Sequence, residues 1–351
     1  MPARPASLLT PRPIHWLWPQ FLARGKLALL DGDPGLGKSQ LLCALAAAVS
    51  RGGEWPCGEG RSPPGNVVIL SGEDDPADTI RPRLDAAGAD VGKVFILSPI
   101  RRDAEGVRVF NLQDDLALLE DAIAAAGDVA LVGIDPISSY LGKVDSHRNA
   151  DLRAVLEPLN EMAARLRVAL LATGHLNKAE GGRAISRVNG SIAFVAVARG
   201  SYLVVRDPAD TARRLFLPAK NNLGPDKDGL AFRIATVPVA EGIVAPRVAW
   251  DGRTTLTADE ALATATAGAK DGADGAAGRQ SEAEAFLAQL LADGPVAATR
   301  VRQEAEERGL AWGTVRRAQD KLKVRPTKPA VGAEWTWSLP PDSRAPPRTM
   351  L

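Results

Sequence analysis

The chain has 351 residues, with 43 Lys and Arg against 42 Asp and Glu and a formal net charge of +1. This balance excludes an overall basic field directed at nucleic acid or a membrane, so any basic footprint must be local. An apolar fraction of 45% supports a sizeable core and excludes bulk disorder, and the length predicts one large and one smaller domain.

No targeting or redox signal is visible in the chain. The N-terminal residues lack an apolar signal core, and the longest apolar helical run, LLCALAAAV, is about half the length needed to span a bilayer. Cys43 and Cys57 have neither metal-ligand nor disulfide-framework spacing. We therefore expect a cytoplasmic protein without a membrane partner.

From residue 26 to about residue 205, short continuous apolar runs alternate with helical stretches, the pattern of buried parallel strands between helices. After residue 205 the pattern changes to a meander separated by Gly, Pro and Asp, which predicts antiparallel strands at one edge. The expected fold class is α/β, a mostly parallel sheet with an antiparallel extension. The parallel runs are KLALLDG, NVVILSG, KVFILSP, VALVGID, VALLATG and SYLVVRD.

Composition predicts where the domains divide. The first domain is expected over residues 1–255, with an N-terminal arm to about residue 24. Residues 256–280 are rich in Ala, Gly and Asp without apolar periodicity, and predict a flexible linker. Three helical patterns and an aromatic strand predict a small domain over 281–340, followed by a disordered Pro-rich tail over 341–351.

One stretch matches a phosphate-binding loop, G-x-x-x-x-G-K-[ST], with an apolar strand before it and a helical pattern after it. Backbone N–H groups of such a loop, with the helix N-terminus, bind phosphate oxygens. Lys38 should reach the β- and γ-phosphates, and the Ser39 hydroxyl should ligate Mg²⁺. The expected nucleotide-binding residues are Gly32, Asp33, Pro34, Gly35, Leu36, Gly37, Lys38, Ser39 and Gln40.

Two further apolar runs end in carboxylates and predict two different roles. In LVGIDP, Asp135 directly follows its strand, where a carboxylate that orients Mg²⁺ belongs. In VVILSGEDDP, Glu73 lies on the loop beyond the strand, where it could polarise the attacking water. Glu73 could instead be an ordinary polar loop residue, and Asp74 and Asp75 are expected to be solvated or helix-capping.

The order of several motifs resembles a known family. WLWPQFLARGKLALLDGDPGLGKS, ILSGEDDP, LVGIDP, LLATGHLNK and LFLPAKNNLG are similar to the RepA-type hexameric helicase-like ATPases (AAA_25) of the RecA/DnaB superfamily, over roughly residues 10–250. The resemblance implies a RecA-like P-loop core that binds ATP and Mg²⁺. It also implies a homo-oligomeric ring, usually a hexamer, with ATP at subunit interfaces and a channel for single-stranded DNA.

The same resemblance suggests roles for residues far from the phosphate loop. His175 would sense the γ-phosphate, or it could be a structural histidine at a strand end. Lys220 would act as a basic finger in trans on the neighbouring subunit's ATP, with Arg206 and Arg213 as competing fingers. Each of the three could equally be a solvated surface charge.

Nucleic-acid contacts are expected in two loops and in the C-terminal domain. The loop candidates are Lys178, Arg183 and Arg187 after His175, and Lys143 and Arg148 after Asp135. The third C-terminal helix is basic and, with a following wing, resembles a winged helix-turn-helix that could bind duplex DNA or dock a protein. Its candidates are Arg316, Arg317 and Lys321.

The leading functional hypothesis is an ATP-hydrolysing, ring-forming motor acting on DNA, a helicase or helicase-like protein of a plasmid, prophage or other mobile element. The alternative is a DNA-binding regulatory or loading protein that uses ATP as an assembly switch without strand separation. A small-molecule P-loop kinase would leave Lys220 and the C-terminal domain unexplained.

Overall fold

The computed structural model describes residues 5–103, 106–142, 144, 149–176, 184–187, 192–225, 228–310, 312–328 and 334–340. The chain divides into two compact units, residues 1–265 and 266–351. Within the described residues, no helix combines the length and the apolar character needed to cross a membrane.

A nine-stranded sheet forms the centre of the first unit, in the order β13-β12-β11-β10-β3-β9-β8-β4-β5. The run from β10 to β5 is parallel, whereas β11, β12 and β13 are antiparallel to their neighbours. The α/β class, the parallel sheet and its antiparallel extension are therefore confirmed. The bounds are β3 Leu27–Gly32, β4 Asn66–Ser71, β5 Val94–Leu97, β8 Val129–Asp135, β9 Ala169–Gly174, β10 Gly200–Arg206, β11 Arg214–Asn221, β12 Gly229–Ala240 and β13 Ile243–Thr254.

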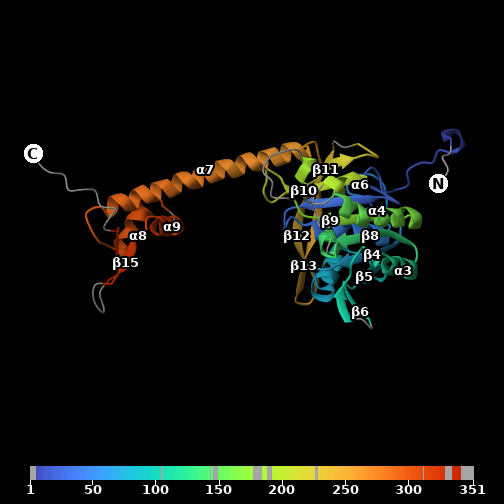
Figure 1. Ribbon diagram of the computed structural model, residues 1–351, viewed down its shortest axis with the longest axis horizontal. Coiled ribbons are helices and arrows are strands. Elements are labelled where there is room, and N and C mark those ends of the chain that lie inside the picture. The colour runs from blue at the N-terminus through green and yellow to red at the C-terminus, as the bar shows by residue number, and fades with distance from the viewer. Residues whose placement is uncertain are drawn as a thin grey trace, which may run out of the picture. The chain divides into compact units, whose positions relative to one another are not determined.

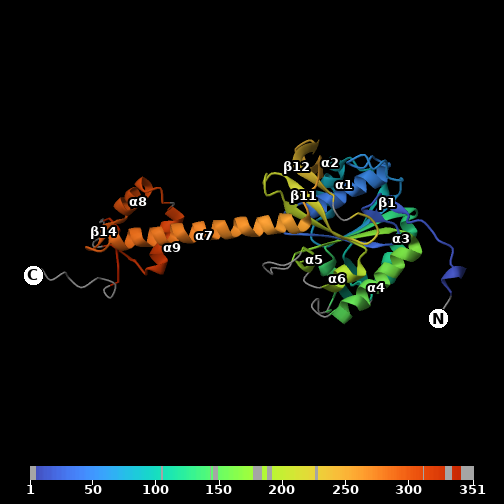
Figure 2. The ribbon, with the colours of Figure 1, turned by 90° about the horizontal axis from the view of Figure 1, so that it is seen from above.

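Helices cover both faces of this sheet, with α1 and α2 on one face and α4 and α6 on the other (Figures 1 and 2). Strand alternation creates the two faces: in β3, Leu27 and Leu29 belong to one core cluster and Ala28 and Leu30 to the other. Burial on both faces explains why the parallel strands read as continuous apolar runs. The helices are α1 Lys38–Arg51, α2 Arg81–Ala87, α3 Leu116–Ala126, α4 Asn149–Leu166, α5 Ala184–Arg187 and α6 Ile192–Val197.

Short elements complete this unit. A hairpin of β1 (Trp16–Trp18) and β2 (Leu22–Ala23) precedes β3, and a second hairpin pairs β6 (Ile100–Asp103) with β7 (Gly106–Val109). The remaining single-turn helices are η1 Ala6–Leu8, η2 Pro76–Ile80, η3 Val91–Lys93 and η4 Ile137–Tyr140.

The second unit has a core of its own, built around Phe286, Leu287 and Trp337. Helices α8 (Ala298–Glu307) and α9 (Trp312–Lys321) pack with a small antiparallel sheet in the order β14-β16-β15. The strands are β14 Val296–Ala297, β15 Arg325–Thr327 and β16 Thr336–Ser338. The winged helix-turn-helix assignment and the domain boundaries stay predictions.

The segment predicted as a flexible linker, 256–280, is helical instead. Helix α7 runs from Ala258 to Leu290, so it covers most of that segment and continues into the second unit. Alanine has the highest helix propensity of the common residues, and its repetition here outweighs the glycines that suggested a linker. The apolar periodicity is missing, which is why the pattern did not predict a helix.

A cluster of aromatic rings attaches the N-terminal hairpin to the sheet. The rings of Tyr202 and Phe216 stack with centroids 4.8 Å apart, and Phe21 and Trp18 pack against Phe216 at 5.7 and 5.6 Å. The Tyr202 hydroxyl is buried and donates a hydrogen bond to the Phe21 carbonyl, at 2.5 Å. This bond joins chain segments 181 residues apart in sequence.

Tyr202→Phe is expected to lower the free energy of unfolding by about 1–2 kcal/mol, because it leaves the buried Phe21 carbonyl without this donor. Tyr140→Phe is the matched control. Tyr140 is equally buried, yet its hydroxyl has no hydrogen-bond partner among the described residues, so its loss should be neutral or slightly stabilising. Urea unfolding followed by circular dichroism compares the variants. Equal losses of unfolding free energy in both would contradict a stabilising role for the Tyr202 hydrogen bond.

Candidate nucleotide site

The predicted phosphate loop connects β3 to α1 at the carboxyl edge of the parallel strands. Gly37 caps the N-terminus of α1 with a φ of 96°, and Gly35 has a φ of 76°. These left-handed conformations favour glycine, so the motif's glycines allow the turn that points backbone N–H groups at a ligand. The loop therefore has the geometry of an anion-binding helix N-terminus.

Lys38 lies inside this loop rather than in solvent. Its side chain is 7% exposed, and its ammonium donates hydrogen bonds to the carbonyls of Gly32, at 2.7 Å, and Asp33, at 3.1 Å. Burial lowers the pKa of Lys38, and the nearby carboxylates of Asp135 and Asp31 oppose that shift. The ammonium is thus held at the loop where phosphate oxygens would bind.

The sheet register brings the two predicted carboxylates together. Ser71, the last residue of β4, pairs with Asp135, the last residue of β8. Glu73 follows two residues later, so it and Asp135 line one pocket of about 190 Å³ together with Lys38 and Ser39. The strand pairing thus places both acids beside the phosphate loop, which the sequence could only suggest.

The residues beside the phosphate loop fit a divalent cation. Ser39 and Asp135 offer one hydroxyl and one carboxylate beside the phosphate loop. Among the described residues, no group of three or more His, Cys, Asp and Glu side chains could hold a metal. A site of this kind suits Mg²⁺, which is usually held by one or two carboxylates together with substrate phosphates and water.

Three further residues line the same pocket, two of which the sequence did not single out. His175 lies directly after β9, in the predicted place. Thr173 is fully buried and donates its hydroxyl hydrogen to Asp135, fixing that carboxylate. Arg83 reaches the pocket from α2 and forms an ion pair with Asp74, in which both side chains are mostly buried.

These missed residues had weak sequence signals. Strand alternation places Thr173 two residues before His175, so it was findable once β9 was assigned. Arg83 is one of two arginines in TIRPRL, and only the helix geometry selects it.

Asp75, expected to be solvated or helix-capping, caps η2. It accepts hydrogen bonds from the backbone N–H groups of Ala77 and Asp78, which lowers its pKa.

Asp31, also missed, is a buried carboxylate in the strand that leads into the phosphate loop. It is fully buried, and its oxygens have no hydrogen-bond partner among the described residues. Burial raises the pKa of Asp31 well above its ordinary value, and Lys38 partly opposes the shift. The residue costs stability at neutral pH, the kind of local inconsistency that accompanies functional sites.

The candidate trans fingers lie elsewhere on the first unit. Lys220 is opposite Ser201 near the end of β11, and its ammonium donates to the carbonyls of Val195 and Ala198 beside α6. Burial lowers the pKa of Lys220, and Arg199 adds to that shift. Because β11 runs antiparallel to β10, Lys220 lies toward the amino edge of the parallel strands, away from its own phosphate loop.

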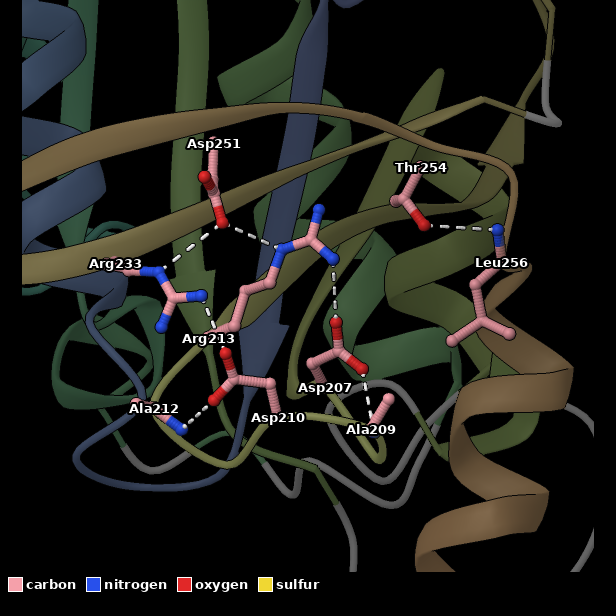
Figure 3. A network of polar contacts seen from close by, with 9 residues as sticks. All are labelled: Asp207, Ala209, Asp210, Ala212, Arg213, Arg233, Asp251, Thr254 and Leu256. Atoms are coloured by element: carbon pink, nitrogen blue, oxygen red, sulfur yellow. Dashed lines mark hydrogen bonds and ion pairs between the residues drawn. The ribbon is translucent and has the colours of Figure 1, made fainter.

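Arg213 and Arg206 differ in how they are held. Figure 3 shows Arg213 in its network of acids. Arg213 forms ion pairs with Asp207, at 3.1 Å, and Asp251, at 3.0 Å, inside a network that also holds Arg233. Arg206 is exposed and donates a long hydrogen bond, 3.3 Å, to the Thr211 carbonyl. The neutralised Arg213 is therefore the weaker candidate of the two.

The predicted nucleic-acid residues divide into two groups. On α9, Lys321 pairs with Glu284 at 2.9 Å, Arg316 bonds Gln319, and Arg317 bonds Thr314, yet all three cations lie on the exposed face. Lys143, Arg148, Lys178 and Arg183 lie outside the described residues, and for Arg187 only the backbone, in α5, is described.

A phosphate loop on a strand–helix junction, flanked by a strand-end carboxylate, defines a P-loop nucleotide-binding protein. Residues 5–181 match the AAA_25 family, described as an AAA domain. The match covers half of the chain, and the chain belongs to this family of P-loop ATPases.

Several curated proteins are similar over part of the chain. The "DNA repair protein RadA" of Streptococcus pneumoniae is 24% identical over 154 residues, 44% of this chain and 31% of that protein. The RadA of Mycobacterium tuberculosis H37Rv is 27% identical over 156 residues, 44% and 28% of the two chains. The RadA of Campylobacter jejuni is 25% identical over 167 residues, 48% and 32%. The chain thus spans about a third of these relatives.

Among solved structures, a chain described as an ATPase domain is similar, with a TM-score of 0.44 and 14% identity. The alignment covers 60% of this chain and 82% of that domain.

Asp31→Asn is expected to stabilise the first unit at neutral pH, with a benefit that disappears in acid. Below the ordinary aspartate pKa of about 3.9, Asp31 is protonated in both the folded and the unfolded chain. As the pH rises through that value, only the unfolded chain ionises, so the wild type loses stability relative to the variant. Thermal unfolding from pH 4 to pH 8 measures the difference, and a gap that does not change with pH would contradict it.

Proposed function

We propose that this protein is an ATP-hydrolysing, ring-forming motor that acts on DNA, a helicase-like ATPase of a plasmid, prophage or other mobile element. The observation that carries the proposal is the pocket in which Glu73 and Asp135, from different strands, meet Lys38 and Ser39. Membership of the AAA_25 family and the DNA-repair relatives support it.

In this proposal the residues of one chain bind and orient ATP. Lys38 leaves the Gly32 and Asp33 carbonyls to hold phosphate oxygens, while Ser39 and Asp135 would hold Mg²⁺, which neutralises the developing phosphate charge. Glu73 is exposed at the pocket rim and can accept a proton from the attacking water. Thr173 keeps the Asp135 carboxylate oriented by its hydrogen bond.

The Arg83–Asp74 ion pair supplies a positioning element for Glu73. Asp74 is the neighbour of Glu73, and its pairing with α2 limits how far the loop that carries both acids can move. Arg83 would therefore act through Asp74 on the geometry of Glu73.

The placement of Lys220 supports a proposal of oligomer formation. Lys220 lies toward the amino edge of the parallel strands and does not line its own nucleotide pocket, so we propose that it completes another subunit's site. In such a ring, hydrolysis would depend on assembly, and the loops after Asp135 and His175 would line the channel for single-stranded DNA.

A second candidate function is an ATP-dependent DNA-binding switch that does not separate strands. The observation that favours it is the second unit, which has its own core and presents Arg316, Arg317 and Lys321 on one exposed helix face. Such a face could neutralise duplex phosphates or dock a protein. Two results would favour this switch. The ATPase rate would not change when single-stranded DNA is added, and a chain lacking residues 281–340 would no longer bind duplex DNA.

Glu73→Gln is expected to lower the rate of ATP hydrolysis by about 10²- to 10⁴-fold while leaving ATP binding nearly unchanged, because only the proton-accepting oxygen is lost. Asp75→Asn, two residues away on the same loop, is the matched control and should keep turnover. Phosphate release and fluorescent-nucleotide titration measure the two quantities. A Glu73→Gln protein with near wild-type turnover would exclude Glu73 as the base.

Mixing two inactive variants tests the trans finger. Lys38→Ala destroys a subunit's own site but keeps its finger, whereas Lys220→Ala keeps the site but lacks the finger. Mixed rings should therefore regain ATPase activity at the interfaces where the two intact halves meet.

Lys220 also binds two carbonyls beside α6, so unfolding of the single variant is measured in parallel. Arg206→Ala mixed with Lys38→Ala tests the competing finger in the same way. No recovery in the Lys220 mixture, with folded proteins, would remove Lys220 from the trans role.

A further inference from the structure

A second pocket, whose charged lining residues are basic, lies on the first unit at the sheet edge opposite the nucleotide site. Its volume is about 960 Å³, and it is lined by the N-terminal arm, the segment before β3 and the segment before β9. Lys26 directly precedes β3 and Arg167 lies two residues before β9, so both mark the amino edge of the parallel strands. Its polar and aromatic lining residues are Arg12, His15, Trp16, Arg24, Lys26 and Arg167.

This pocket concentrates positive charge without neutralising it. Arg12, Arg24, Lys26 and Arg167 contribute four cations, and no Asp or Glu is among the described lining residues. Arg24 and Lys26 are half-buried, yet the described residues place no carboxylate within ion-pair distance of either one. Arg83 and Arg213, which are also half-buried, are each paired with an acid.

Half-burial of unpaired cations is costly, because each loses hydration and gains no partner. Arg24 and Lys26 bear this cost, beside the exposed Arg12 and Arg167, in a protein whose net charge of only +1 gives no overall basic surface. A ligand that carries several negative charges would offset the cost.

The pocket is built by backbone contacts between distant segments. The Arg24 N–H donates to the His15 carbonyl at 2.8 Å, and the Gly25 N–H donates to the Val168 carbonyl at 2.8 Å. Arg167 has a φ of 55°, a left-handed conformation that is unfavourable for a residue other than glycine. The arm, the strand entry and this arginine are thus held in fixed register around the cavity.

The chemistry of the lining selects a single-stranded nucleic acid. Separated cations match the repeated phosphates of a backbone, and the half-exposed Trp16 ring gives a base a surface on which to stack. A duplex keeps its bases stacked inside, where Trp16 could not reach them, whereas an unpaired strand can present both groups together. We propose that this amino-edge pocket binds single-stranded DNA as phosphates and one or more stacked bases.

This site differs from the loops proposed to line a channel, which follow the carboxyl ends of β8 and β9. It would hold a strand on the opposite edge of the same sheet, as it approaches or leaves the motor. The inference depends only on the pocket and would stand for a protein without ATPase activity.

Photocrosslinking of the full-length protein locates the strand directly. An oligonucleotide of thymidine with 5-bromodeoxyuridine substitutions is irradiated with the protein, and crosslinked peptides are identified by mass spectrometry. The proposal expects crosslinks at Trp16, within residues 12–26. Crosslinks confined to other segments would overturn it.

Charge variants test the same site in solution. Fluorescence anisotropy with a labelled thymidine oligonucleotide is measured for Arg12→Glu/Arg167→Glu, both exposed positions, and for Arg24→Gln/Lys26→Gln. Each pair removes two phosphate contacts, so the slope of log K against log salt concentration should shrink by about 1.4. Arg247→Glu, an exposed arginine outside the pocket, is the control and should bind like the wild type.

Unchanged slopes in both pocket variants, with normal thermal unfolding, would refute the site. Free ATP and thymidine monophosphate are also tested as competitors, at the same phosphate concentration as the oligonucleotide. If either competes as effectively as the oligonucleotide, the site is refuted, because the pocket would then take single nucleotides. Neither result would alter the ATPase measurements of Glu73→Gln, so failure of this pocket and failure of the proposed motor are separable.

Discussion

The parallel pairing of β3, β9, β8 and β4 is the constraint on which the site depends. Parallel strands end at one edge, so the phosphate loop after β3, Asp135 at the end of β8 and Glu73 beyond β4 must converge there. Pairing of Ser71 with Asp135 then sets the offset between the two acids. A change in that register would separate Asp135, which we propose holds the metal, from Glu73, which we propose acts on the attacking water.

The antiparallel extension leads the chain away from the carboxyl edge of the parallel strands. It carries β11 back toward the amino edge, where Lys220 lies far from its own phosphate loop in the sheet but could meet that of another subunit. The unneutralised pocket of Arg24 and Lys26 belongs to the same edge. The two edges of the first unit thus differ chemically: the carboxyl edge carries the phosphate loop with Glu73 and Asp135, and the amino edge carries Arg24 and Lys26.

Sequence reasoning predicted the features that depend on local chemistry. The phosphate loop needs only its own glycines, and the strand-end acids need only the apolar runs before them, so both could be identified without a structure. Arg83 could not, because its role arises from helix packing. Thr173 has only the indirect signal of strand alternation, and its hydrogen bond to Asp135 depends on which face of β9 points at that acid. The sequence pattern also did not predict the helix that begins at Ala258, since alanine repetition forms a helix without an apolar face.

In the function that we propose, hydrolysis is completed between subunits on DNA. The direct measurement is the ATPase rate per chain over a range of protein concentrations, with oligomer mass determined by analytical ultracentrifugation in the same samples, with and without single-stranded DNA. We expect a rate that rises with the assembled fraction and rises further with DNA. Full activity in a monomer, indifferent to DNA, would contradict it.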